Sequence, residues 1–201
     1  MHAPLKYTPL VCENNPELTK SGLNTGGVFL RSDYLLRGEL VHVLAALMPE
    51  NRLACEISLA TGLRISDVLN IRSEQLSERF SVRELKTGKR RLVRLPAELL
   101  DRAHAIKGKI YVFEGRLNHR KPRSRQAVYK DLKRAATLFR IDKKLQISPH
   151  SMRKVWSVEQ LKRYGGNVAK VQQLLNHNDE AVTMLYVMSD VLTERKLHGK
   201  Q

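Results

Sequence analysis

Several features that mark whole classes of protein are missing from this sequence of 201 residues. Its two cysteines, Cys12 and Cys55, have neither CxxC nor Cys/His spacing, so they predict no metal site of that kind. No apolar run approaches the roughly 20 residues of a membrane span. The first ten residues lack the charged start and apolar stretch of a signal peptide. We therefore expect a cytoplasmic protein with no membrane partner, in which Cys55 is a core residue.

Two further absences concern cofactors. The sequence has no glycine-rich phosphate loop of the P-loop kind, and no cluster of carboxylates that would hold magnesium. We therefore predict no cofactor and no metal. With 42% hydrophobic residues, the chain still has enough apolar side chains for the core of one good-sized domain.

Acidic residues are also scarce, with 20 Asp and Glu against 36 Lys and Arg, which gives a net charge of +16. Residues 83–144 alone contain 20 basic and 6 acidic side chains, which is +14 of that total. A solvated basic face that aids solubility is the alternative, but solubility does not require one sign to dominate one segment. Such a concentration favours a polyanion, above all nucleic acid. The candidate contacts are Lys89, Arg90, Arg120, Lys121, Arg123, Arg125, Lys130, Lys133 and Arg134.

Turn residues and hydrophobic periodicity predict an α+β fold that is mainly α-helical, with a small antiparallel hairpin. Residues 1–30 have no sustained period and predict an irregular extension. Pro49 is expected to end a first helix, and Asn51 to cap the second. The first expected helices are 34–48, 52–61, a short one at 65–69, and 96–106. Three more follow: 125–139 capped by Ser124, one from 149 to the Gly165-Gly166 break, and 168–175 capped by Asn167. The expected strands are the two arms of a hairpin over 80–95 and a third strand at 110–113.

The run from His150 to Tyr186 carries the residues best suited to chemistry on a phosphate. His150 and Arg153 are three residues apart, so on a helix they share a face. His177 and Tyr186 follow after short helices and tight turns. Each residue alone has an ordinary explanation: His177 as a helix cap or surface histidine, and Tyr186 as a packed aromatic. Together they offer a cation, two proton-transfer groups and a phenol.

Two earlier positions extend this set. Arg64 follows the Gly62 turn, and Asp67 lies three residues later, so its carboxylate could hold the guanidinium in place. An ordinary capping pair at a helix start is the alternative, and spacing alone slightly favours it. Lys86 lies at the tip of the predicted hairpin. Such a lysine is usually just solvated, although a mobile ammonium there can also deliver a proton into a groove.

Four stretches in order resemble the catalytic domain of the tyrosine recombinase (phage integrase) family: TGLRISDVLNI, LKTGKRRLVRLP, HSMRK and VQQLLNHNDEAVTMLY. The resemblance covers about residues 32–188 and implies the tyrosine recombinase catalytic-domain fold. It matches catalytic residues to Arg64, Lys86, His150, Arg153, His177 and Tyr186, and a supporting acidic residue to Asp67. Asn176 departs from the family, which often has glycine there, and that departure bears on His177.

The resemblance implies a site-specific recombinase or integrase that cleaves and rejoins double-stranded DNA through a 3′-phosphotyrosine link with a free 5′-hydroxyl. Tyr186 would attack phosphorus, and Arg64 and Arg153 would hold the non-bridging oxygens. His150 would accept the phenolic proton, Lys86 would protonate the departing oxygen, and His177 would hydrogen-bond the phosphate. No ATP or metal would be needed.

The resemblance also implies a homotetramer on synapsed DNA sites, nucleoid association, and an accessory DNA-bending protein as a further candidate partner. We expect residues 31–201 to form the catalytic domain, with a tail helix after Ser189. Nothing in the first thirty residues matches the family's N-terminal DNA-clamping domain, so we expect either a compact recombinase or an excised domain. Two alternatives remain open: a DNA-relaxing enzyme of the type IB topoisomerase kind, and a DNA-binding regulator that keeps the fold without strand exchange.

Overall fold

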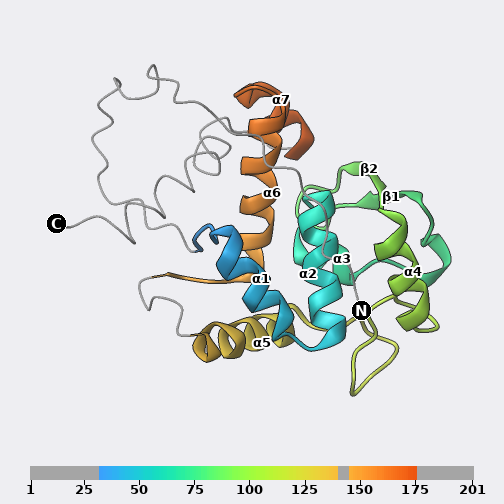
Figure 1. Cartoon of the computed structure of the whole chain (residues 1–201). Helices are drawn as coiled ribbons and strands as arrows, with labels where there is room; N and C mark the ends of the chain where they lie inside the picture. Colours follow the sequence, from blue (N-terminus) through green and yellow to red (C-terminus); the bar gives the residue numbers. More distant parts are fainter. Residues whose placement is uncertain (1–31, 140–144, 176–201) are drawn as a thin grey trace. The chain divides into compact units, whose positions relative to one another are not determined.

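The computed structural model describes residues 32–139 and 145–175, and these form a mainly helical α+β domain with one small antiparallel sheet (Figure 1). This confirms the predicted fold class. The predicted extension at 1–30 and tail helix after Ser189 lie outside the described residues. The elements in chain order are α1 (Arg37–Ala45), α2 (Pro49–Thr61), α3 (Ile65–Leu69), the 3₁₀ turn η2 (Ser73–Gln75), β1 (Arg79–Arg83), β2 (Arg90–Arg94), α4 (Ala97–Ile106), α5 (Arg125–Leu138), α6 (Pro149–Arg163) and α7 (Val168–Leu175).

Helices α2 and α6 run side by side, and α5 packs against α1, α3 and α6 near one end of this pair (Figure 1). The start of α2 differs from the prediction. Pro49 does not end the preceding helix but occupies the first turn of α2, and Asn51 lies inside the helix rather than capping it. The physical reason is that the first helical position needs no backbone N–H, so proline is well suited to it. No helix within the described ranges is long and apolar enough to cross a membrane.

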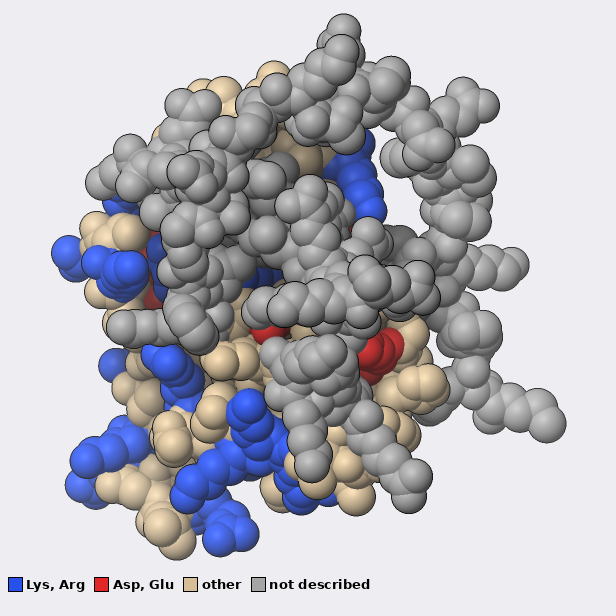
Figure 2. All heavy atoms as spheres, turned by 90° about the vertical axis from the view of Figure 1, so that its left-hand side faces the viewer, with Lys and Arg blue, Asp and Glu red and all other residues tan. Residues whose placement is uncertain are grey.

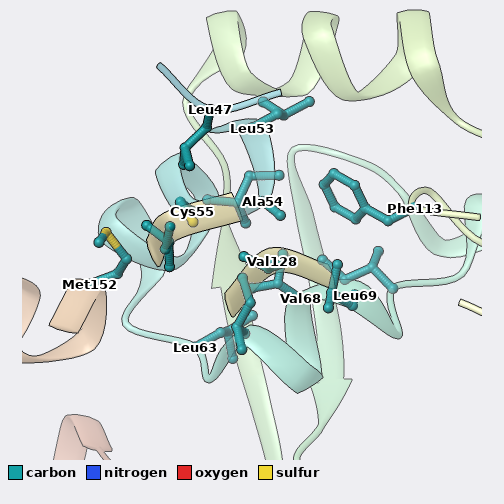
Figure 3. Packing of buried hydrophobic residues seen from close by; sticks show 14 of the residues in the cluster. Leu47, Leu53, Ala54, Cys55, Leu63, Val68, Leu69, Phe113, Val128 and Met152 are labelled. Carbon is teal, nitrogen blue, oxygen red and sulfur yellow. The ribbon is translucent and has the colours of Figure 1, made fainter. Parts of the chain in front are cut away.

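The hydrophobic core is centred on α2 and α3, which contribute half of the side chains labelled in Figure 3. Met152 of α6 belongs to the same cluster as the buried residues of α2. Cys55 is fully buried among them, as predicted, and burial raises the pKa of its thiol well above the usual range. The labelled core residues are Leu47, Leu53, Ala54, Cys55, Leu63, Val68, Leu69, Phe113, Val128 and Met152.

Strands β1 and β2 pair antiparallel, with Phe80 opposite Val93. Phe80, Val82 and Val93 face the core, whereas Leu92 is exposed. The predicted third strand at 110–113 is wrong within the described residues. Ser73 and Val112 bond to the carbonyls of Ile110 and Ile71, so this segment pairs with residues 71–73 instead of with the hairpin.

The basic connection between α4 and α5 is folded back on itself. Gly115 donates its N–H to Lys121, and Lys121 donates to Asn118, so residues 115–121 form a closed loop. Ser124 then caps α5 as predicted, because its Oγ accepts a 3.1 Å hydrogen bond from the N–H of Ala127. The sequence of this region therefore gives an ordered loop followed by a helix of 14 residues.

Asp131 fixes α5 to the start of α2. One carboxylate oxygen accepts 2.8 Å hydrogen bonds from the Met48 N–H and the Asn51 amide, and the other accepts from Arg134 at 2.7 Å. Burial alone would raise the pKa of Asp131, but these hydrogen bonds and the charge of Arg134 outweigh it, and the pKa lies below the usual aspartate value. The ionised carboxylate therefore stabilises the folded chain.

We expect Asp131→Asn to lower the free energy of unfolding by about 1–3 kcal/mol at neutral pH, because an amide nitrogen must face one of the donors. Urea unfolding measures this, with Asp101→Asn as the control, since Asp101 is exposed and its side chain makes no hydrogen bond or ion pair with the described residues. The folded pKa is depressed, so the stabilisation exists above the usual aspartate pKa and is lost as pH falls through the folded value. A difference that persists unchanged in acid would contradict this assignment.

Candidate active site

The centre of the candidate site is the turn between α2 and α3. Gly62 ends α2 with φ of 68°, a left-handed conformation that favours glycine, and its N–H bonds to the Ser58 carbonyl. The Trp156 ring of α6 packs directly over it, so a Cβ at position 62 would lie 2.5 Å from the ring. Ser58 Oγ donates to the Leu63 carbonyl at 2.7 Å and fixes the next residue. This turn sets where Arg64, the N-cap residue of α3, begins.

Two arginines hold the carbonyls of this turn. Arg153 of α6 donates from Nη1 to the Gly62 carbonyl at 2.6 Å, and from Nη2 to the Leu175 carbonyl at the end of α7 at 2.8 Å. Arg91 of β2 donates to the Thr61 and Gly62 carbonyls and lies over the Trp156 ring. Both therefore complement the C-terminal end of α2, where unpaired carbonyls concentrate negative charge. The sequence reasoning missed Arg91.

Arg64 pairs with Glu84 rather than with Asp67. The distance from Arg64 Nη1 to Glu84 Oε2 is 2.7 Å, and Thr87 Oγ donates to the same oxygen at 2.9 Å. Glu84 is fully buried, and its other oxygen lies 3.9 Å from Arg91 Nη1. Burial would raise the pKa of Glu84, but the hydrogen bonds and the charges of Arg64 and Arg153 lower it below its usual value.

The sequence reasoning missed Glu84 as well, although one signal was present. Glu84 is the only acidic residue between positions 80 and 95, in a segment rich in Lys and Arg. A lone carboxylate among so many cations suggests a specific partner. The pattern could not say that the partner is Arg64, because 20 residues separate the two along the chain.

Asp67 has a different contact from the expected one. Its Oδ1 accepts a 2.9 Å hydrogen bond from the Leu85 N–H, and the side chain is buried. Burial raises the pKa of Asp67; the Leu85 hydrogen bond and the charges of Arg64 and Arg153 oppose this, while the charge of Glu84 adds to it. Asp67 thus lies within electrostatic range of Arg64, but the direct carboxylate partner of the guanidinium is Glu84.

Of the four remaining predicted catalytic residues, the structure describes Lys86 and His150. Lys86 is exposed in the turn between β1 and β2. His150 lies half-buried in the first turn of α6, where its N–H bonds to the N-cap Ser148 Oγ, and one helical turn later Arg153 is fully buried. His177 and Tyr186 lie outside the described residues. The structure brings Arg64 and Arg153 to the same turn, because Arg153 binds the carbonyl of Gly62 and Arg64 follows two residues later. The catalytic roles of these residues stay predictions.

The predicted DNA-binding residues also divide into two groups. Arg123 contacts the Asn51 side chain and Glu50, and Arg134 bonds to Asp131 and the Ala46 carbonyl. The others are exposed: Lys89, Arg90, Arg120, Lys121, Arg125, Lys130 and Lys133. Figure 2 shows Lys and Arg side chains gathered over the lower part of one face, at the level of α5, with few Asp or Glu among them. In residues 32–139 and 145–175, no group of three or more His, Cys, Asp or Glu is placed to hold a metal ion.

Comparison with known proteins decides the family. The model of the phage integrase family matches residues 35–192. The chain belongs to the phage integrase family. It is 30% identical to the probable integrase/recombinase YoeC of Bacillus subtilis strain 168, covering 67% of this chain and 75% of that one. It is 28% identical to the tyrosine recombinase XerD of Lacticaseibacillus casei, covering 68% of this chain and 49% of that one. The chain thus spans only about half the length of XerD.

Solved structures of phage integrase family members share the fold. The catalytic domain of bacteriophage HP1 integrase superposes with a TM-score of 0.58 at 21% identity, covering 84% of this chain and 95% of that one. The lambda integrase tetramer bound to a Holliday junction superposes with a TM-score of 0.64 at 19% identity, covering 78% and 48%. At these identities the likeness establishes the fold, and it agrees with the predicted catalytic-domain architecture.

We expect Gly62→Ala to be more destabilising than Gly88→Ala. Both glycines have φ of 68°, so an alanine at either position costs about 1–2 kcal/mol for the left-handed backbone. Only position 62 adds the clash with Trp156, since nothing lies within 4 Å of a Cβ at position 88. Overpacking adds about 1–3 kcal/mol. Thermal and urea unfolding of the two variants measure the difference, and equal losses would show that the Trp156 contact is unimportant.

Proposed function

We propose that this phage integrase family member is a site-specific recombinase that cleaves and rejoins double-stranded DNA, with Tyr186 as the nucleophile. The observation that supports it best is the convergence of two arginines far apart in sequence. Arg64 forms an ion pair with the buried carboxylate of Glu84, and Arg153 donates to the carbonyl of Gly62, two residues before Arg64. The charges of both arginines lower the pKa of Glu84. Two guanidinium groups in one place suit the non-bridging oxygens of a phosphodiester.

Arg64 is the arginine better prepared for phosphate. Glu84 occupies Nη1, while Nε and Nη2 make no hydrogen bond with the described residues, and the side chain is 17% exposed. Arg153 is fully buried and donates to two backbone carbonyls. We infer that Arg64 meets the phosphate first, and that Arg153 joins when a phosphate oxygen replaces a carbonyl. Apo geometry commonly tightens in this way only when substrate is bound.

In the proposed cleavage step, the phenolic oxygen of Tyr186 bonds to phosphorus and the bond from phosphorus to the 5′-oxygen breaks. The phenolic proton passes to His150, and Lys86 supplies a proton to the departing 5′-oxygen. His177 hydrogen-bonds a non-bridging oxygen. The product is a 3′-phosphotyrosine, and rejoining is the reverse attack by a 5′-hydroxyl. An ordinary tyrosine pKa is about 10, so nearby cations would be needed to favour the phenolate.

The partners are proposed from the surface and the fold. The exposed cations of the 115–121 loop and α5 would contact DNA phosphates, while Arg123 and Arg134 would hold that surface in place through Asn51 and Asp131. The lambda integrase structure on a Holliday junction is a tetramer, and we propose a homotetramer on paired sites here, with the predicted tail helix after Ser189 available to a neighbouring protomer. An accessory DNA-bending protein remains a further candidate partner.

Tyr186→Phe should abolish the covalent protein–DNA adduct while DNA binding persists. A nicked substrate carrying the target site traps the adduct. The short strand with the free 5′-hydroxyl diffuses away after cleavage, so rejoining cannot occur, and denaturing gels then detect the protein linked to DNA. Tyr111→Phe is the matched control, since Tyr111 is half-buried beside Arg72 and is not one of the predicted catalytic residues.

An adduct formed by Tyr186→Phe would contradict the assigned nucleophile. Specific DNA binding by the natural sequence without any adduct would favour the regulator interpretation. Relaxation of supercoiled DNA without sequence preference would favour a topoisomerase-like activity. Assays of adduct formation, DNA binding and supercoil relaxation distinguish these three outcomes.

Arg120→Gln should weaken DNA binding and reduce the salt dependence of affinity. Each phosphate contact contributes about 0.9 to the slope of log affinity against log salt, so losing one contact should lower the slope by about that amount. Lys107→Gln removes the same charge at the exposed end of α4 and serves as the control. Titrations at several salt concentrations measure both slopes. Equal effects of the two variants would indicate that only net charge matters.

A further inference from the structure

Glu84 connects the turn between β1 and β2, which carries Lys86, with the arginines of the candidate site. The turn is closed by backbone hydrogen bonds on both sides, because Glu84 donates to the Lys89 carbonyl at 2.9 Å and accepts from the Gly88 N–H at 2.8 Å. Its side chain points the other way, into the protein, where it is fully buried. Backbone and side chain of one residue thus connect the turn to the core.

Two donors from different parts of the chain share one oxygen of the Glu84 carboxylate. Arg64 Nη1 donates from the start of α3 at 2.7 Å, and Thr87 Oγ donates from the residue after Lys86 at 2.9 Å. A second link runs in parallel, because Asp67 of α3 accepts from the Leu85 N–H at 2.9 Å. The residues on both sides of Lys86 are therefore tied to α3, directly or through Glu84, although Lys86 itself is exposed.

The same contact restricts Arg64. A guanidinium held at Nη1 by a buried carboxylate has a fixed orientation, and its Nε and Nη2 remain for a ligand. A buried carboxylate is costly unless it is paired, and here the positive charges around it supply that pairing. The geometry gives Glu84 one contact with the proposed phosphate clamp and one with the turn of the proposed proton donor.

We propose that Glu84 is a positioning residue that holds Lys86 and Arg64 in a fixed arrangement relative to each other. The phosphate clamp and the proton donor can then reach the same phosphodiester. The inference rests on the proposed function and goes beyond it, because none of the family motifs quoted above assigns a role to position 84. Glu84 would not contact DNA. Its removal should therefore affect proton delivery to the leaving oxygen more than DNA affinity.

A DNA substrate whose leaving group needs no proton can distinguish this positioning role from a purely structural one. In a DNA substrate with a sulfur in place of the 5′-bridging oxygen, the departing thiolate is stable at neutral pH, so loss of the proton donor matters little. We expect Glu84→Gln to cleave the ordinary substrate about 10–100-fold more slowly than the natural sequence. This is less than the roughly 10²–10⁴-fold of a full acid–base contribution, because Lys86 is still present. The sulfur substrate should restore most of that rate, as it should for Lys86→Ala.

The double variant Glu84→Gln/Lys86→Ala provides the second measurement. If Glu84 acts through Lys86, the two losses on the ordinary substrate should be less than multiplicative. Thr87→Val is a milder variant that removes the Oγ hydrogen bond to Glu84 at little change in volume, and it should show the same sulfur rescue with a smaller loss. Glu74→Gln, at an exposed position without contacts to the described residues, is the control.

Several results would overturn the proposal. A Glu84→Gln protein that folds and cleaves at the natural rate would show that the contact is dispensable. Slow cleavage of both substrates without sulfur rescue would show that Glu84 supports only Arg64 or the fold, and Thr87→Val distinguishes this if Glu84→Gln unfolds. If the natural sequence forms no adduct at all, the proposed function fails instead, so the two failures are distinguishable.

Discussion

The left-handed turn at Gly62 is the constraint on which the candidate site depends. It lets the chain leave α2 under the Trp156 ring and presents carbonyls that Arg91 and Arg153 both bind. Because Arg64, the N-cap residue of α3, follows two residues later, the turn also fixes where Arg64 lies. A side chain at position 62 would separate α2 from α6, and the arginines would lose their common acceptor. The site is therefore built around a backbone position rather than around a catalytic side chain.

Buried carboxylates allow so basic a chain to keep its arginines close together. Like charges at short range repel, and burial makes that repulsion stronger. The negative charge of Glu84 offsets this repulsion at the candidate site. Arg64 and Arg91 form ion pairs with its carboxylate, and the charge of Arg153 also lowers its pKa. Asp131 does the same between α2 and α5, where it binds Arg134. The acidic residues are scarce in the sequence, and these two lie where cations must converge.

Local signals in the sequence predicted most of the helices and the hairpin, because glycine turns and capping residues act on their own neighbours. Gly62, Ser124 and Asn167 all end or cap helices as expected. Residues 110–113 failed because an apolar run does not say which backbone it will pair with. Glu84 and Arg91 were missed for a related reason: their partners are distant in sequence, and only the folded chain brings Glu84 to Arg64.

The bond from Arg153 to the Leu175 carbonyl extends the site to the end of α7. Leu175 is the last residue of α7, and the predicted His177 follows two positions later. A phosphate oxygen that took the place of this carbonyl would release the end of α7 at the moment the clamp closes. Because a buried arginine must keep its hydrogen bonds, the exchange is favourable only when an acceptor at least as strong as the carbonyl arrives, and a phosphodiester anion is such an acceptor.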